Sequence, residues 1–132
     1  MQLEDKVFDI KSDHEFVQVT LEVFNYQYEN IKIYREFCGH LKVNPSVVNE
    51  ISEIPFLPIE FFKSHHIGDS SNFDKLFLSS GTTQQERSKH YVKDIDVYKR
   101  SFFNGFEKFY GNPSDYLIAA ILPGYVDNPN SS

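Results

Sequence analysis

A hydroxyl-rich turn contains the residues whose types point most directly to chemistry. An apolar run leads into Ser79, Ser80, Gly81, Thr82 and Thr83. Because glycine has no Cβ, the backbone at Gly81 can adopt unusual dihedral angles and approach a ligand closely, while neighbouring amides and hydroxyls donate hydrogen bonds to oxyanions. This composition suits a phosphate-binding loop. It is also typical of a polar hairpin turn, so the surrounding residues must decide between the two interpretations.

Basic residues follow the turn closely. Arg87, Lys89 and His90 come within seven residues of Thr83. If this segment folds back beside the turn, these side chains can neutralise phosphate charge. Glu86 lies in the same segment and opposes that positive field. A solvent-exposed hairpin arm is therefore the alternative to a phosphate contact.

Other common sites have little support. The sequence contains neither Gly-x-x-x-x-Gly-Lys-Ser/Thr nor Gly-x-Gly-x-x-Gly, which argues against the two most familiar nucleotide-binding folds. No histidine pair has the close helical spacing of zinc ligands, so we expect no metal site in the chain itself. Cys38 is the only cysteine and His40 is too near in sequence to reach it easily. We expect a buried structural thiol there, with no disulfide.

The elements that position the turn begin with a helix. Ser12 and Glu15 match a capping box, which predicts a helix start. Apolar residues then recur at helical spacing over residues 16–37, and Gly39 is the predicted stop. The aromatic residues of this helix are expected to form a core. An acyl-chain pocket is the alternative for the same residues.

Two further segments connect this helix to the turn. Asn44 before Pro45 repeats the start signal, and it predicts a short helix over 46–52. The two prolines of segment 54–58 exclude ordinary helix there and predict an extended connector. One helical turn is expected over 59–63.

The rest of the chain predicts a small sheet and a helix. Residues 76–78 and 88–93 are candidate antiparallel strands on either side of the turn. A helix over 94–110 should end at Gly111. The continuous apolar run 116–122 predicts a strand buried on both faces. The helix is expected to turn the following residues inward: Val97, Phe102, Phe106 and Phe109.

These elements indicate an α/β fold in one domain of 132 residues. A helical region over 1–53 precedes the start of a mixed sheet over 54–132, made of a phosphate-loop hairpin, a helix and the buried strand. The formal net charge of −6 argues against binding to nucleic acid or to an anionic membrane surface. With no secretory signal and no apolar run long enough to span a bilayer, we expect a cytoplasmic location.

Several segments together resemble one enzyme family. Residues 78–83 with 88–91, the connector 54–63, the helix 98–111 and the segment 122–125 are similar to the acyl-protein synthetase family, the fatty-acid ligases of bacterial luminescence and their relatives. The resemblance covers about residues 50–132. The family usually has glycine after the paired threonines, where this chain has Gln84.

The resemblance implies the fold, substrates and site of an adenylate-forming enzyme. It implies that a fatty acid carboxylate attacks ATP, with Mg²⁺, to give an acyl-adenylate whose acyl group then passes to a thiol. The resemblance implies that the phosphates contact the following residues: Ser79, Ser80, Gly81, Thr82, Thr83, Lys89 and His90. The catalytic residues are not assigned.

Relatives of this family are much longer. We therefore expect the 132 residues to be the N-terminal part of such an enzyme and to have little or no ligase activity alone. The alternative is a non-catalytic interaction module that pairs its exposed sheet with a second copy or with a C-terminal polypeptide. A regulatory nucleotide binder is a third possibility, and it would bind ATP without transferring an acyl group.

Overall fold

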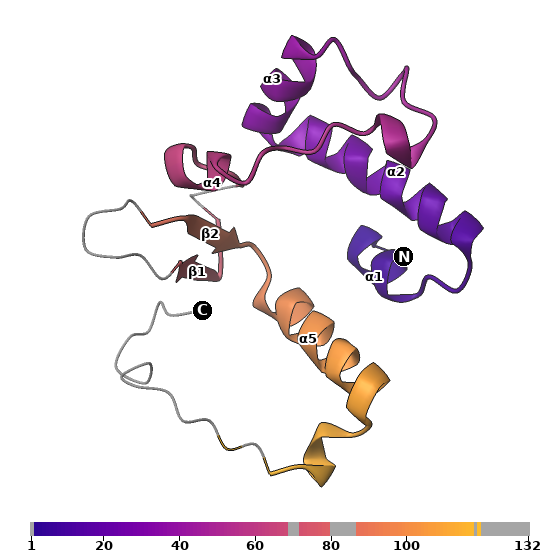
Figure 1. Ribbon diagram of the computed structural model, residues 1–132, viewed down its shortest axis with the longest axis vertical. Coiled ribbons are helices and arrows are strands. Elements are labelled where there is room, and N and C mark those ends of the chain that lie inside the picture. The colour runs from indigo at the N-terminus through magenta and orange to yellow at the C-terminus, as the bar shows by residue number, and fades with distance from the viewer. Residues whose placement is uncertain (1, 69–71, 80–86, 118, 120–132) are drawn as a thin grey trace. The chain divides into compact units, whose positions relative to one another are not determined.

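A computed structural model describes residues 2–68, 72–79, 87–117 and 119. The chain divides into two compact units, Met1–Gly68 and Asp69–Ser132. Figure 1 shows the helices of the first unit, and the two strands and long helix of the second. The described elements are mostly helical with one small antiparallel sheet, which agrees with the predicted α/β class.

The predicted capping box starts the longest helix. In α2, Asp13–Asn30, the Ser12 Oγ accepts a hydrogen bond from the Glu15 amide at 3.2 Å. The Glu15 carboxylate accepts from the amide of Lys11 at 2.7 Å, one residue earlier than in the usual box. A short helix that the sequence analysis did not predict, α1, Leu3–Phe8, precedes α2.

The prediction of one continuous helix from Ser12 to Gly39 was wrong, because the chain leaves helical geometry at Ile31. Its φ of −109° and ψ of 99° are extended, and α3, Lys32–His40, begins at the next residue. The break allows the Tyr34 ring to meet the Phe24 ring edge-on, with 6.1 Å between their centroids. Tertiary packing thus overrides a helical pattern that continues through the break.

The end of α3 lies beyond the predicted stop at Gly39. The Lys42 amide donates to the Gly39 carbonyl at 3.0 Å, and the Val43 amide donates to the Cys38 carbonyl at 3.0 Å. This pair of bonds is a Schellman motif, and its left-handed position is filled by Lys42 with φ of 58°. Glycine is the residue that usually occupies this position.

The prediction of a short helix over 46–52 was also wrong. Asn44 does cap the Ser46 amide at 2.9 Å, but only a turn follows. Glu50 is extended, and the Glu53 carboxylate accepts hydrogen bonds from the amides of Asn49 and Glu50, which lower the pKa of that carboxyl. These bonds end the turn and start a separate 3₁₀ helix, η1, Ile51–Glu53.

The connector and the turn after it match the sequence prediction. Residues 55–58 have no regular secondary structure, and α4, Phe61–Ser64, is a single helical turn. The Tyr34 hydroxyl donates to the Pro55 carbonyl at 2.7 Å, which fixes the connector against α3. The core of this unit is the following cluster: Phe24, Tyr34, Cys38, Val48 and Ile54. Of the aromatic residues of α2, Phe24 and Tyr28 contribute to the core, as predicted, whereas Phe16 and Tyr26 are exposed.

The second unit contains the predicted hairpin and helix. Strands β1, Lys75–Leu78, and β2, Lys89–Val92, pair antiparallel, with Leu78 opposite Lys89. Helix α5, Ile95–Tyr110, starts at Asp94 and ends at Gly111, whose φ of 83° is a conformation that favours glycine. A 3₁₀ turn, η2, Pro113–Asp115, follows.

Two predictions for the C-terminal part of the chain do not hold for all of the described residues. Of the four α5 residues expected inward, Phe102 and Phe109 are exposed. Of the strand predicted over 116–122, the described residues are Tyr116, Leu117 and Ala119, and none of them is in a strand. The other residues of that run lie outside the described part of the chain.

Candidate functional site

The hairpin stem brings together the two ends of the hydroxyl-rich turn. Beyond the last strand pair, the Ser79 amide donates to the Ser88 carbonyl at 3.1 Å. The Ser88 amide returns a hydrogen bond to the Ser79 Oγ at 2.9 Å. The base of the turn is thus closed once by the main chain and once by a side chain.

Ser79 is the one residue of the predicted loop pentad that the structure describes. Ser80, Gly81, Thr82 and Thr83 lie outside the described residues. A hydroxyl has one proton to donate in addition to its acceptor sites, so the bond from Ser88 leaves the Ser79 proton available to a further acceptor. Ser79 therefore both closes the turn and retains one donor.

Lys89 and His90 lie on opposite faces of the hairpin. Side chains alternate along a strand, and the register pairs Lys89 with Leu78 but His90 with Phe77. Lys89 is thus paired with the residue just before Ser79, at the base of the turn. Its exposed side chain has no hydrogen bond or ion pair to the described residues. It can therefore reach an anion at the turn without first losing a partner.

The face that carries His90 also carries an aromatic contact with α5. The Phe77 and Tyr98 rings lie 5.3 Å apart, and the Lys75 ammonium lies 6.0 Å from the Phe77 centroid. His90 thus shares its face with the packing between hairpin and helix. Of the two basic residues that the resemblance implies as phosphate contacts, Lys89 is on the other face.

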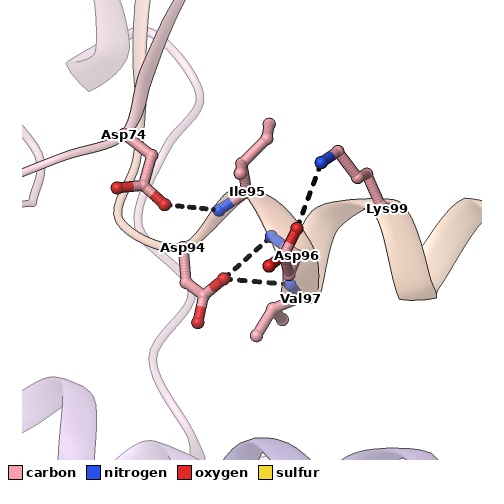
Figure 2. A network of polar contacts seen from close by, with 6 residues as sticks. All are labelled: Asp74, Asp94, Ile95, Asp96, Val97 and Lys99. Carbon is pink, nitrogen blue, oxygen red and sulfur yellow. Dashed lines mark hydrogen bonds and ion pairs between the residues drawn. The ribbon is translucent and has the colours of Figure 1, made fainter.

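Aspartate side chains already accept hydrogen bonds from the backbone amides at the start of α5 (Figure 2). The Asp94 Oδ1 accepts from the amides of Asp96 at 2.8 Å and Val97 at 3.2 Å, and the Asp74 Oδ2 accepts from the Ile95 amide at 3.0 Å. A helix N-terminus otherwise attracts anions. Because these donors are occupied, the start of α5 does not offer these three amides to an anion.

Asp74 is a structural residue that sequence reasoning missed. Its amide also donates to the Val92 carbonyl at 2.9 Å, so it ties the end of the hairpin stem to the start of α5. The contact joins residues 21 positions apart, for which no local motif exists. The helix start at Asp94, by contrast, was predictable from its own neighbours.

The remaining candidate groups have structural roles. Cys38 is fully buried, and burial raises the pKa of its thiol, which disfavours the nucleophilic thiolate. The prediction of a structural thiol is therefore supported. The His65 ring stacks on the Phe61 ring at 4.8 Å, and its Nδ1 lies 2.8 Å from the Ser64 Oγ. In the part of the chain that the structure describes, no three metal-ligating side chains gather.

None of the helices built from the described residues is long and apolar enough to cross a membrane.

Comparison with known proteins identifies the family. A family model for acyl-protein synthetase, LuxE, matches residues 7–99. The match reaches further toward the N-terminus than the resemblance noted from sequence, since it begins in the last turn of α1 and includes α2 and α3, and it ends within α5. Searches among curated proteins and among solved structures found no match. Since the matched residues are more than half of the chain and include the hairpin, the chain belongs to the LuxE family of acyl-protein synthetases.

Proposed function

We propose that the hairpin supplies the phosphate-binding wall of an ATP site in an enzyme that activates a fatty acid. The observation that carries this proposal is the closed stem at Ser79 and Ser88, with Lys89 beside it, whose ammonium has no partner among the described residues. The family match supports acyl transfer as the overall activity. The pentad of hydroxyls and glycine at 79–83 is the phosphate-binding segment in this proposal.

The proposed reaction requires fixed donors near phosphorus. A carboxylate oxygen attacks the α-phosphorus of ATP, the bond to the bridging oxygen breaks, and pyrophosphate leaves with the electron pair. A thiolate then attacks the acyl carbon and AMP leaves. Amides, hydroxyls and a cation that are already in place stabilise the negative charge on the phosphoryl oxygens without reorganising. Mg²⁺ accompanies the ATP phosphates and supplies further positive charge.

Each described residue of the site has a separate task in this proposal. Ser79 holds the ends of the turn together, and its remaining proton reaches a phosphate oxygen. Lys89, on one face of the hairpin, neutralises negative charge of the ATP phosphates. His90 is assigned a flanking contact from the opposite side of β2. The hairpin and α5 would be the first part of the mixed sheet and helices of an adenylate-forming fold.

A calorimetric titration with ATP and magnesium tests this assignment. The wild-type chain should bind ATP saturably, and Lys89→Ala should weaken binding about tenfold or more, because a hydrogen bond to a charged group contributes roughly 1.5–3 kcal/mol. Lys108→Ala is the matched control, since this lysine lies in the last turn of α5. The proposal is wrong if no heat is observed at millimolar ATP, or if the two variants bind equally well.

One observation favours the alternative of an interaction module. Large aromatic side chains of α5 are exposed, including Phe102 at 51% and Phe109 at 78%. Exposed apolar patches of this kind mark protein contacts. Gel filtration over a range of concentrations separates the two functions: a concentration-dependent dimer that Phe109→Ser abolishes would support the module, and a monomer at all concentrations would contradict it.

A further inference from the structure

The first unit contains an apolar cavity that the phosphate-binding proposal does not use. Its volume is about 340 Å³, which lies within the range of roughly 300–1,000 Å³ for small-molecule pockets. The α2 helix, the connector and α4 contribute most of its wall. Its apolar lining consists mainly of the following residues: Val23, Phe24, Ile31, Ile54, Leu57 and Phe62.

The polar groups of the wall are few and mostly engaged. The Thr20 hydroxyl donates to the Phe16 carbonyl at 2.7 Å, and the Tyr34 hydroxyl donates to the Pro55 carbonyl at 2.7 Å. Gln27 is the remaining polar residue of the lining, which includes no charged side chain. The cavity thus suits neither a carboxylate nor a cluster of ordered water, each of which needs several polar partners.

The connector makes one wall of the cavity rigid before any ligand arrives. Pro55 and Pro58 fix two backbone φ angles, and the bond from Tyr34 holds the connector at its first proline. Between them Phe56 lines the cavity while 76% of its surface is exposed. A preformed wall lowers the entropy lost on binding, and the Phe56 ring offers further apolar surface at the rim.

We propose that this cavity binds the apolar end of a single acyl chain whose polar head stays outside. The assignment rests on the proposed function, in which the substrate is a fatty acid, and it extends that function by placing the chain in the helical unit. A single aliphatic chain fits the observations because the wall is apolar and uncharged. A folded peptide or a phosphorylated ligand would require polar partners that the lining lacks.

A chain-length series tests the proposal on the 132-residue protein without ATP or magnesium. Octanoate, decanoate, dodecanoate and tetradecanoate are titrated by calorimetry below their micelle concentrations. Affinity should increase about threefold to fourfold per methylene until the cavity is full, and then level off, since each buried methylene contributes roughly 0.8 kcal/mol. Dodecanol should bind about as well as dodecanoate. Absence of saturable binding by these compounds would overturn the proposal.

Two substitutions on α2 form a matched pair. Val23→Phe places a larger side chain in the cavity and should weaken dodecanoate binding at least tenfold. Val17→Phe is the same change at an exposed position outside the lining, and it should leave binding unchanged. Equal affinity in the two variants would contradict the assignment.

Phe62→Ala keeps the test decisive if Val23→Phe fails to fold. It enlarges the cavity, so the chain length at which affinity levels off should increase by two or more methylenes. A levelling point that stays at the same chain length in this folded variant would exclude the cavity as the site.

Failure of this inference is distinguishable from failure of the proposed function. Lys89→Ala should weaken ATP binding and leave dodecanoate binding unchanged. A chain that binds dodecanoate with the predicted length dependence but does not bind ATP would retain the cavity and lose the phosphate site. The converse result would retain the phosphate site alone.

Discussion

The helical unit and the hairpin unit differ in how they are held together. In the first, five residues form a buried cluster around Phe24 and Cys38. In the second, Val92, at 7% exposed, is the one described hydrophobic residue that is buried, and most large side chains of α5 are exposed. The first unit is stabilised by packing, whereas the second depends on strand pairing, caps and ring contacts at its surface. The proposed phosphate turn therefore belongs to the unit with less buried surface, where local opening costs less.

The largest expected effect on stability comes from removing an aromatic ring from the core of the helical unit. Phe24→Ala should destabilise the helical unit by about 3–5 kcal/mol, because it removes apolar contacts and leaves a cavity. Urea unfolding followed by far-ultraviolet circular dichroism measures the change. Phe16→Ala, on an exposed site of the same helix, should cost less than about 0.5 kcal/mol. Similar costs for both would mean that the core is not where the structure places it.

A smaller effect is expected from the cap that starts α5. Asp94→Ala removes two hydrogen bonds to helix amides and should destabilise α5 by about 1–2 kcal/mol. Hydrogen exchange of the α5 amides measures this local effect. Asp94→Asn keeps an acceptor oxygen and should retain most of the protection. Unchanged exchange in the alanine variant would show that packing, and not the cap, holds this helix.

The pH dependence of stability reports on the buried pair of Cys38 and Tyr34. Burial raises the pKa of both groups, so the neutral forms are favoured in the folded chain. Their contribution is complete below the unfolded cysteine pKa of about 8.5 and is lost as the pH rises further, by at most about 1.4 kcal/mol per pH unit for each group.

Urea unfolding between pH 8 and 10 measures this slope. Stability should decrease over that range in the wild type and decrease less steeply in Cys38→Ala. A flat profile, or equal slopes in the two proteins, would mean that the thiol is not buried as described.

The smallest expected effect is a gain in stability at the end of α3. Lys42→Gly should stabilise the helical unit by up to about 1 kcal/mol, because glycine adopts a φ of 58° without the clash of a Cβ. Lys42→Ala keeps that clash and should give no such gain. Thermal unfolding measures both variants, and a loss of stability in the glycine variant would contradict the described end of α3.

Local signals predicted much of the hairpin unit. The two paired strands and the helix that ends at Gly111 follow from residues next to one another in sequence. The start of α2 at Ser12 was predictable for the same reason. At the two described helix starts, Ser12 and Asp94, the predicted capping agrees with the structure.

The helical unit was harder to predict because distant contacts decide its breaks. The apolar pattern runs through Ile31 without interruption, and only the packing of Tyr34 on Phe24 accounts for the break there. Lys42 occupies a position where sequence patterns favour glycine. For the candidate site, sequence singled out the turn, its basic neighbours and the alternation of Lys89 and His90, but the residues opposite them required the strand register.

Hydrogen–deuterium exchange with each ligand alone tests the division of tasks between the two units most directly. Magnesium and ATP should protect amides of residues 79–89 and leave the helical unit unchanged. Dodecanoate should protect α2 and the connector and leave the hairpin unchanged. Protection of the helical unit by ATP, or no protection of the hairpin at saturating ATP, would contradict the account.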